Sequence, residues 1–178
     1  INVKEIIARV GLPCFVKPNN AGSSFGISKA KTTSEMIPAI EKAFKEDSQI
    51  LIEEFLDGTE VTVGVLKFNG KIKVLPMTEI VSENEFFDYE AKYLGKSQEI
   101  TPARISEEIH EKLEKLASHV YKILNMSGFS RSEYILVNND PYFLEMNTVP
   151  GLTTASLIPQ QVEAAVISLE EFFHNPIE

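Results

Sequence analysis

Two short segments rich in β-branched and aromatic residues lie on either side of a strong turn signal near the carboxyl end of the chain. Residues 131–137 and 141–147 flank Asn138-Asn139-Asp140. Asparagine and aspartate favour turns because their short side chains bond to nearby backbone groups. The sequence therefore predicts an antiparallel β-hairpin, and the register of that hairpin decides which side chains share a face.

The predicted register depends on the length of the turn. A three-residue loop would place Glu133 opposite Glu145, because side chains alternate between faces with a period of two. The same register would place Arg131 opposite Asn147, whereas a two-residue loop would put the two carboxylates on opposite faces. Facing like charges destabilise a sheet by roughly 0.2 to 1 kcal/mol, so the first register suggests a cation between them. Oxygen ligands beside a guanidinium favour a magnesium-phosphate site, and an ordinary solvated hairpin is the alternative.

A loop containing glycine and serine follows an apolar segment near the start of the chain. Residues 13–18 include Lys17, and residues 19–26 contain Gly22, Ser23 and Ser24. Backbone N–H groups in such a loop can bind phosphate oxygens, with a lysine at its base as a point charge. The spacing is not that of a Walker loop, and an ordinary turn is the alternative.

Two further segments are candidates for nucleotide contacts. Residues 49–60 predict a buried strand that leads into a polar turn and could supply an adenine slot and, through Glu60, a carboxylate for a ribose diol. Acidic side chains that face water are the alternative there. Residues 86–93 lie in a long loop of high aromatic content, where Lys92 would be a second cation for a phosphate, or the aromatic residues would anchor a surface loop.

Taken together and in order, these segments resemble the D-alanine:D-alanine ligases of the ATP-grasp superfamily. The resemblance spans nearly the whole chain. It is carried by V-K-P-x-x-x-G-S-S-x-G at 16–26, E-E-F-x-x-G-x-E at 53–60, D-Y-E-A-K-Y at 88–93, R-x-E at 131–133 and E-x-N-T-x-P-G-x-T-x-x-S-x-x-P at 145–159.

The resemblance implies a role for each candidate site residue. For ATP, it implies phosphate binding by Lys17 and Lys92, a covering loop with Ser23 and Ser24, an adenine frame of Glu53, Glu54, Phe55 and Leu56, and a ribose contact at Glu60. For two Mg²⁺ (or Mn²⁺) ions, it implies the ligands Glu133, Glu145 and Asn147, with Glu145 bridging. For catalysis and the second D-alanine, it implies Arg131, the backbone at Gly151, Ser23, Tyr93, Ser156 and Leu157.

Two differences from the family pattern are visible. Many members carry aspartate where this chain has Glu133, which keeps the carboxylate. Members also begin with a further domain that helps to hold the first D-alanine, and with a phosphate-binding lysine that would precede Ile1. We therefore expect the chain to be the ATP-grasp part of a longer ligase, and we expect the 178 residues alone to be inactive.

The resemblance and the local patterns together predict an α+β chain. The ATP-grasp fold would consist of two α+β subdomains with ATP between them, residues 1–57 as an incomplete central subdomain and 58–178 as the carboxyl-terminal one with the metal and second-substrate sites. Local signals predict a helix capped by Ser34, a hairpin through Asn69-Gly70 and a long helix capped by Ser106.

Composition limits the partners. With 178 residues, 43% hydrophobic and 24% charged, the chain can bury a full core without disulfides. Its net charge of -9 disfavours nucleic acid, and the single cysteine and absence of a long apolar run favour a cytoplasmic protein without a membrane partner. The expected partners are ATP and D-alanine, and a homodimer is compatible with the resemblance for the full-length protein.

Three functions fit the sequence. The first is the ATP-dependent joining of two D-alanines through a D-alanyl phosphate for peptidoglycan precursor synthesis. The second is a related reaction, by a D-alanine:D-lactate or D-serine ligase or by another ATP-grasp carboxylate-amine ligase; Tyr93 favours D-alanine by the resemblance. The third is a nucleotide-binding module without turnover.

Overall fold

The computed structural model describes residues 1–20, 22, 24–82 and 97–174. The chain forms two compact units, one built on Ile1–Leu56 and the other on Asp57–Val81 and Gln98–Glu178. Both units combine helices with antiparallel strands, so the predicted α+β class is confirmed. The assignment of the units to particular ATP-grasp subdomains stays a prediction. Among the helices of the described residues, none has the length and apolarity that crossing a membrane requires.

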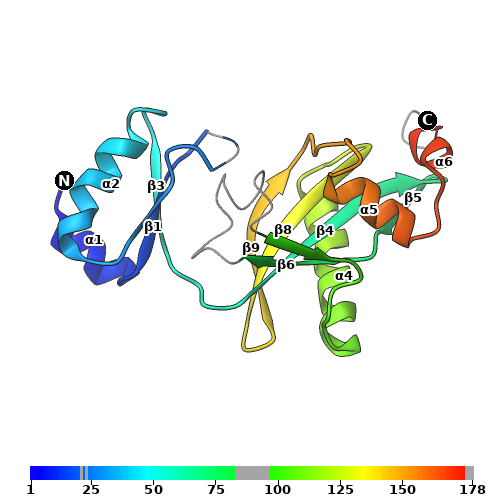
Figure 1. The fold of residues 1–178 in the computed structure, drawn as a ribbon, viewed down its shortest axis with the longest axis horizontal. Helices are drawn as coiled ribbons and strands as arrows, with labels where there is room; N and C mark the ends of the chain where they lie inside the picture. The colour runs from blue at the N-terminus through cyan, green and yellow to red at the C-terminus, as the bar shows by residue number, and fades with distance from the viewer. Residues whose placement is uncertain (21, 23, 83–96, 175–178) are drawn as a thin grey trace. The chain divides into compact units, whose positions relative to one another are not determined.

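The first unit is a three-stranded antiparallel sheet with two helices packed on one face (Figure 1). In the central strand, Cys14 and Val16 are fully buried against apolar side chains of both helices, including Met36 and Ile40. The strand order is β2-β1-β3. The bounds are α1 Val3–Val10, β1 Cys14–Pro18, β2 Ser28–Ala30, α2 Thr33–Ala43 and β3 Ile50–Glu54.

Helix α2 begins earlier than the sequence analysis predicts. Its N-cap is Thr32, not Ser34, and the Glu35 carboxylate accepts a hydrogen bond from the Thr32 N–H at 3.3 Å. This is a capping box, in which a threonine and a glutamate three residues later satisfy each other's backbone N–H groups. The predicted cap is therefore wrong, because the reciprocal Thr32–Glu35 pair satisfies two donors where a lone serine satisfies one.

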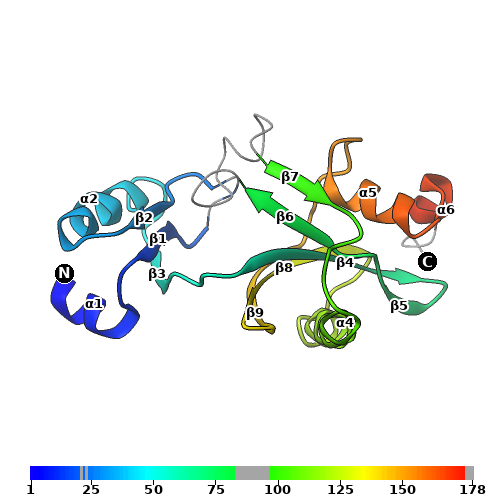
Figure 2. The same cartoon turned by 60° about the horizontal axis from the view of Figure 1, so that its bottom comes forward.

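The second unit is a six-stranded antiparallel sheet with helices on both faces. Figure 2 shows α4 on one side of the sheet and α5 with α6 on the other. The strand order is β7-β6-β4-β8-β9, and β5 pairs with β4 alone. The bounds are β4 Thr59–Phe68, β5 Lys71–Val74, β6 Thr78–Ser82, β7 Ser97–Ile100, α4 Glu107–Ile123, β8 Phe129–Val137, β9 Asp140–Asn147, α5 Leu157–Ala164 and α6 Leu169–His174.

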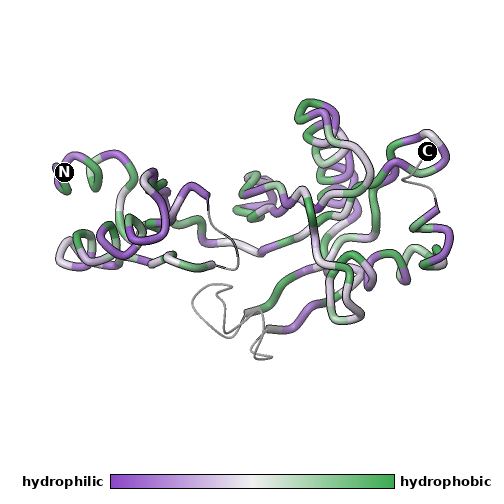
Figure 3. The backbone as a smooth tube through the Cα atoms, turned by 90° about the horizontal axis from the view of Figure 1, so that it is seen from above, coloured by the Kyte–Doolittle hydropathy of each residue, from purple (hydrophilic) through white to green (hydrophobic). Residues whose placement is uncertain are grey.

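Strand β4 is buried on both faces, and its alternate residues pack against different helices. Val61, Val63 and Val65 belong to the core that includes Leu113 and Ala117 of α4. Leu66, on the opposite face, packs with Ile158 and Val162 of α5. The helices are amphipathic and change between hydrophilic and hydrophobic along their length (Figure 3). The predicted Ser106 cap of α4 and the Asn69-Gly70 turn between β4 and β5 are confirmed.

A charged pair joins β6 to the segment that precedes α4. Glu79 is 8% exposed, and its carboxylate accepts hydrogen bonds from Arg104 Nε and Nη2, both at 2.8 Å. These side-chain hydrogen bonds are the main cause that lowers the pKa of Glu79 from its ordinary value, although burial acts in the opposite direction. The bidentate geometry makes the pair specific for arginine.

Arg104→Met should lower the free energy of unfolding at neutral pH by on the order of 1 to 2 kcal/mol, because the buried Glu79 carboxylate would keep only the backbone N–H of residue 104 as a donor. The folded pKa of Glu79 is depressed, so its contribution is present above the unfolded-state pKa and is lost as pH falls through the folded-state pKa. The difference between parent and variant in urea melts should therefore shrink as the pH is lowered through the acidic range in which Glu79 is protonated. A difference that is constant with pH would contradict this account.

Candidate functional site

The β8–β9 hairpin closes through a short turn. Val137 pairs with Asp140, so the loop has two residues. These residues, Asn138 and Asn139, have φ angles of 51° and 70°, the left-handed region that asparagine tolerates. Of the two loop lengths that the sequence analysis left open, the structure has the two-residue one. A regular ladder that starts from this turn would separate Glu133 and Glu145 onto opposite faces.

A β-bulge restores the predicted pairing. Tyr134 pairs with Phe143, but the next pair is Glu133 with Glu145, so Leu144 is an extra residue in β9. An extra residue reverses the alternation beyond it, which places both carboxylates on one face. The pairing of Glu133 with Glu145 and of Arg131 with Asn147 is confirmed.

This polar group shares a face with alternate residues of β4. Thr62 lies opposite Glu133, and Gly64 lies opposite Arg131. Glu60 precedes Thr62 by two residues and projects to the same face. Helix α4 packs on the other face, beneath Val61 and its neighbours. The sheet therefore brings together four of the predicted residues on the face that α4 leaves uncovered, and Glu60 lies on that same face.

Arg131 and Glu133 form an ion pair on this face. Arg131 Nη2 donates to Glu133 Oε1 at 2.5 Å, and Glu133 is 4% exposed. Arg131 Nε is buried and has no hydrogen-bond partner within the described residues. An unpaired buried donor costs about 1 to 3 kcal/mol, so an anionic ligand that accepts from Nε would be stabilised there. The guanidinium suits an oxyanion or a phosphate oxygen.

The donor set fits a hard divalent cation. Glu133, Glu145 and Asn147 offer carboxylate and amide oxygens, which magnesium prefers. Asn147 Oδ1 accepts from the N–H of Val149 at 3.1 Å, which fixes the amide and leaves the oxygen a second lone pair. Among the described residues, no group of three or more His, Cys, Asp or Glu side chains is arranged so that it could hold a metal ion. The set described here has two carboxylates, and its third oxygen ligand is the Asn147 amide.

The segment after β9 brings Gly151 against the start of α5. A Cβ atom at Gly151 would lie 2.7 Å from Ser156 Oγ, so a side chain there would force the Ser156 hydroxyl to move. Ser156 precedes α5, but its hydroxyl makes no capping bond and lies 2.9 Å from the Thr153 hydroxyl. Leu157 is 5% exposed, so its side chain belongs to the core and only its backbone N–H can meet a ligand. A helix N-terminus with a nearby hydroxyl suits a carboxylate.

In the first unit, the sheet face without helices carries another group of predicted residues. Phe15 and Lys17 alternate with the buried residues of β1, and Phe15 lies opposite Glu53. Lys17 Nζ lies 2.5 Å from Glu53 Oε2, in an ion pair that is partly shielded from water. Glu54 projects to the opposite face and is exposed, so its side chain does not join this group.

Hydrogen bonds fix both ends of this face. After β3, the Phe55 N–H donates to the Pro13 carbonyl at 3.2 Å, and Leu56 follows as a half-buried residue. Before the glycine loop, Asn20 donates to Asp47 from its backbone N–H and from Nδ2, at 2.7 and 3.0 Å. The pKa of Asp47 is lowered, first by the Gln49 N–H and then by Asn20. The sequence analysis missed Asp47, because it lies 27 residues from its partner.

The glycine loop is described only in part. Ser24 has a φ of 60° and Gly26 a φ of 75°. A Cβ at Gly26 would lie 2.7 Å from Pro18 Cγ, so the last glycine of the motif is required by packing as well as by conformation. Ser23, Lys92 and Tyr93 lie outside the described residues.

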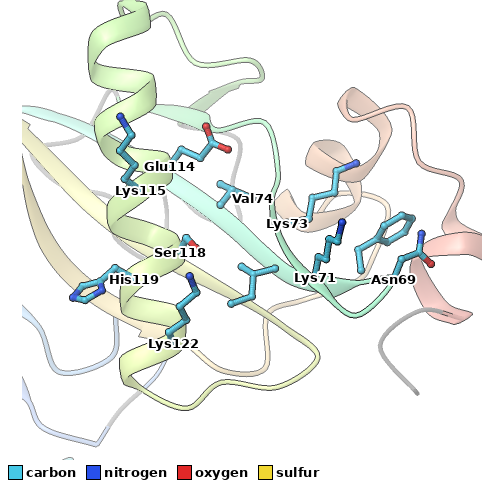
Figure 4. Close-up of a pocket in the computed structure, with 11 residues that line it drawn as sticks. Asn69, Lys71, Lys73, Val74, Glu114, Lys115, Ser118, His119 and Lys122 are labelled. Atoms are coloured by element: carbon cyan, nitrogen blue, oxygen red, sulfur yellow. The ribbon is translucent and has the colours of Figure 1, made fainter.

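An open groove of about 1010 Å³ lies elsewhere, between the β4–β5 hairpin and α4 (Figure 4). It contains none of the predicted site residues. Lys71 and Lys73 belong to β5, an edge strand, where lysine discourages pairing with other chains. Figure 4 shows Lys115 and His119 directed away from these two lysines. The charges do not converge, and the groove is not a candidate for the site.

Comparisons with known proteins agree with the geometry. A D-alanine–D-alanine ligase of Flavobacterium johnsoniae is 67% identical over 178 residues, which are 100% of this chain and 55% of that protein. A D-alanine–D-alanine ligase of Christiangramia forsetii is 60% identical, again over 100% of this chain and 55% of the relative. The chain thus spans about half the length of these curated relatives.

Solved structures of the same kind have this fold. VanG D-Ala:D-Ser ligase from Enterococcus faecalis has a TM-score of 0.85 at 36% identity, over 98% of this chain and 51% of that one. A D-alanine–D-alanine ligase from Bacillus anthracis has a TM-score of 0.83 at 33% identity, over 99% and 58%. A Bacillus anthracis D-alanine–D-alanine ligase complexed with ATP has a TM-score of 0.78 at 28% identity, over 99% and 53%. The predicted ATP-grasp fold is confirmed.

The family comparison covers almost every residue. The model described as D-ala D-ala ligase C-terminus matches residues 2–178. Together with the relatives and the fold, this match identifies the chain as a member of the D-ala D-ala ligase C-terminus family.

Proposed function

We propose that this chain carries the nucleotide, metal and second-substrate sites of an ATP-dependent D-alanine:D-alanine ligase. The reaction would join two D-alanines through D-alanyl phosphate and supply D-alanyl-D-alanine for peptidoglycan synthesis in the cytoplasm. The observation that supports it most is the pairing of Glu133 with Glu145 beside Arg131, because this face offers both hard oxygen ligands and an unpaired cationic donor. A homodimer of the longer protein belongs to the same proposal.

The nucleotide would be bound by residues that the resemblance assigns to ATP. Lys17, now paired with Glu53, would exchange that partner for phosphate oxygens, because a phosphate carries more negative charge than one carboxylate. Residues 53–56 would meet the adenine, and Glu60 would accept from the ribose hydroxyls. Lys92, Ser23 and Ser24 complete this proposed site.

Phosphoryl transfer needs positioning and charge neutralisation more than covalent chemistry by the protein. Glu133, Glu145 and Asn147 would hold two Mg²⁺ (or Mn²⁺) ions, which would offset the charge on phosphate oxygens. Arg131 Nε and the Gly151 N–H would donate to the oxyanion that forms when the second amine attacks D-alanyl phosphate. Ser156 and the Leu157 N–H would hold the carboxylate of the second D-alanine, with Tyr93 favouring D-alanine.

A chimera tests the proposed activity. This chain would replace the matching segment of the Flavobacterium johnsoniae ligase, to which it is 67% identical. We expect D-alanine-dependent ADP release comparable to that of the parent ligase. Arg131→Met in the chimera should lower kcat by on the order of 10²- to 10³-fold, because one oxyanion donor is lost. The control, Arg9→Met, removes an exposed charge from α1 and should keep full activity.

A folded chimera that binds ATP without D-alanine-dependent turnover would reject the ligase proposal and favour a nucleotide-binding module. D-serine is the main alternative second substrate, because VanG D-Ala:D-Ser ligase shares 36% identity with this chain. Assays with D-serine, D-lactate and other amines beside D-alanine separate these activities by product mass. A preference for any of them over D-alanine would replace the proposed substrate.

A further inference from the structure

Lys29 lies on the open sheet face of the first unit, in the edge strand β2. It pairs with Phe15 of β1, which in turn pairs with Glu53 of β3, so the three side chains are aligned across the three strands. All three project away from the helices, because the alternate residue Ala30 is buried against them. This face therefore carries a cation that none of the sequence motifs includes.

The Lys29 ammonium group contacts an aromatic ring. Its Nζ lies 3.5 Å from the centroid of the Phe55 ring. The rings of Phe15 and Phe55 are 6.0 Å apart at an interplanar angle of 54°. A cation within about 6 Å of a ring centroid is attracted by the negative face of the ring. Lys29 thus holds Phe55, and Phe55 with Phe15 forms an aromatic wall at the end of β3.

We propose that Lys29 is a positioning residue for the base of the bound nucleotide, which it acts on through the ring of Phe55. This inference rests on the proposed adenine site at residues 53–56. A base needs an apolar wall beside it, and a wall that is already ordered binds more tightly because less side-chain freedom is lost on binding. Lys17 lies on the same face as an ion pair with Glu53, and it is the proposed phosphate cation.

Two ligands separate this role from a direct phosphate contact. ATP carries a base and phosphates, whereas inorganic tripolyphosphate carries phosphates alone. Calorimetry would measure both on the parent chain, Lys29→Met, Lys29→Arg and a control, Lys45→Met, which removes an exposed lysine just beyond α2. Methionine keeps the length of the side chain without its charge, and arginine keeps the cation over the ring.

We expect Lys29→Met to weaken ATP binding roughly three- to tenfold, because the cation–π contact is lost. Tripolyphosphate affinity should stay within about twofold, and Lys29→Arg should restore ATP binding. In Phe55→Leu, the additional change Lys29→Met should have no further effect, since the ring through which it acts is gone. Without ligand, the Lys29 ε-methylene protons should resonate upfield of those of the other lysines, because they lie over the ring.

Several outcomes would overturn the inference. Equal losses for ATP and tripolyphosphate would make Lys29 a phosphate contact. If Lys29→Met binds ATP as tightly as the parent chain, Lys29 has no positioning role. The same conclusion follows if Lys29→Met weakens ATP binding as much in the Phe55→Leu protein as in the parent. Both outcomes leave the proposed function intact. A parent chain that binds tripolyphosphate but not ATP would overturn both the inference and the proposed function. A loss in Lys45→Met equal to that in Lys29→Met would overturn the inference alone, because a general charge effect would then explain both losses.

Discussion

Glu145→Gln should remove most of the magnesium-dependent part of ATP binding and weaken the Mg²⁺–ATP complex by roughly 10- to 100-fold. The substitution keeps the size of the side chain but removes one of the two facing carboxylates of the β8–β9 hairpin. Cation affinity depends on the number of ligand charges, and a bridging ligand would be lost to two ions at once. Calorimetric titration of ATP with and without Mg²⁺ measures the two parts separately.

The matched control is Glu163→Gln, which removes a carboxylate from the exposed side of α5. It changes the net charge equally, so a general electrostatic effect would appear in both variants. Magnesium-free ATP binding should not be weakened in either variant and should be equal or slightly tighter in Glu145→Gln, because the neutral side chain repels phosphate less. A Glu145→Gln protein with the parent's affinity for Mg²⁺–ATP would reject the bridging role.

In the β8–β9 hairpin, the expected pairing of Glu133 with Glu145 is present although the loop is one residue shorter than this pairing required. Facing carboxylates were predicted from a three-residue loop, yet the loop has two residues and the bulge at Leu144 supplies the missing one. Turn residues and alternation are local signals, so they predict the two strands. A bulge is set by the packing of the whole sheet and has no reliable local signal.

The first unit gives a similar lesson. The apolar strand that contains Lys17 and the acidic strand that contains Glu53 were predicted separately, and the sheet places their side chains in contact. Alternation predicts that one face of each strand is polar, but it does not predict which strands are neighbours. The contact of Lys29 with Phe55 was missed for that reason, as was the anchoring of the glycine loop by Asp47.

Gln161 was missed because a buried glutamine in a helix resembles any other polar residue in the sequence. Its side chain is fully buried against the sheet at the point where the neighbouring strand of β4 changes from β6 to β5. Gln161 Oε1 accepts from the Gly64 N–H at 3.0 Å, and Nε2 donates to the Thr62 carbonyl at 3.1 Å. In the gap between β6 and β5, the Gln161 amide thus makes the two hydrogen bonds with β4 that a peptide group of a neighbouring strand would make.

Gln161→Leu should lower the free energy of unfolding by roughly 2 to 5 kcal/mol, because two buried backbone groups of β4 would lose their partners. The volume of the side chain changes little, so the loss comes from hydrogen bonds and not from a cavity. Urea melts measure it. Gly64→Ala should also destabilise, since a Cβ there would lie 2.4 Å from Gln161 Oε1 and 2.8 Å from Ile158 Cδ1.

The controls for Gln161 separate its hydrogen bonds from the general effect of a larger apolar surface on α5. Glu163→Leu, on the exposed side of the same helix, should change stability by no more than about 0.5 kcal/mol. Gln161→Glu should be destabilised at neutral pH, because a buried carboxylate cannot donate to the Thr62 carbonyl. It should regain part of that stability in acid, where a protonated carboxyl donates again. A Gln161→Leu protein as stable as the parent would show that water or a shift of the β5–β6 connection satisfies the two groups, and the amide would then have no structural role in the sheet.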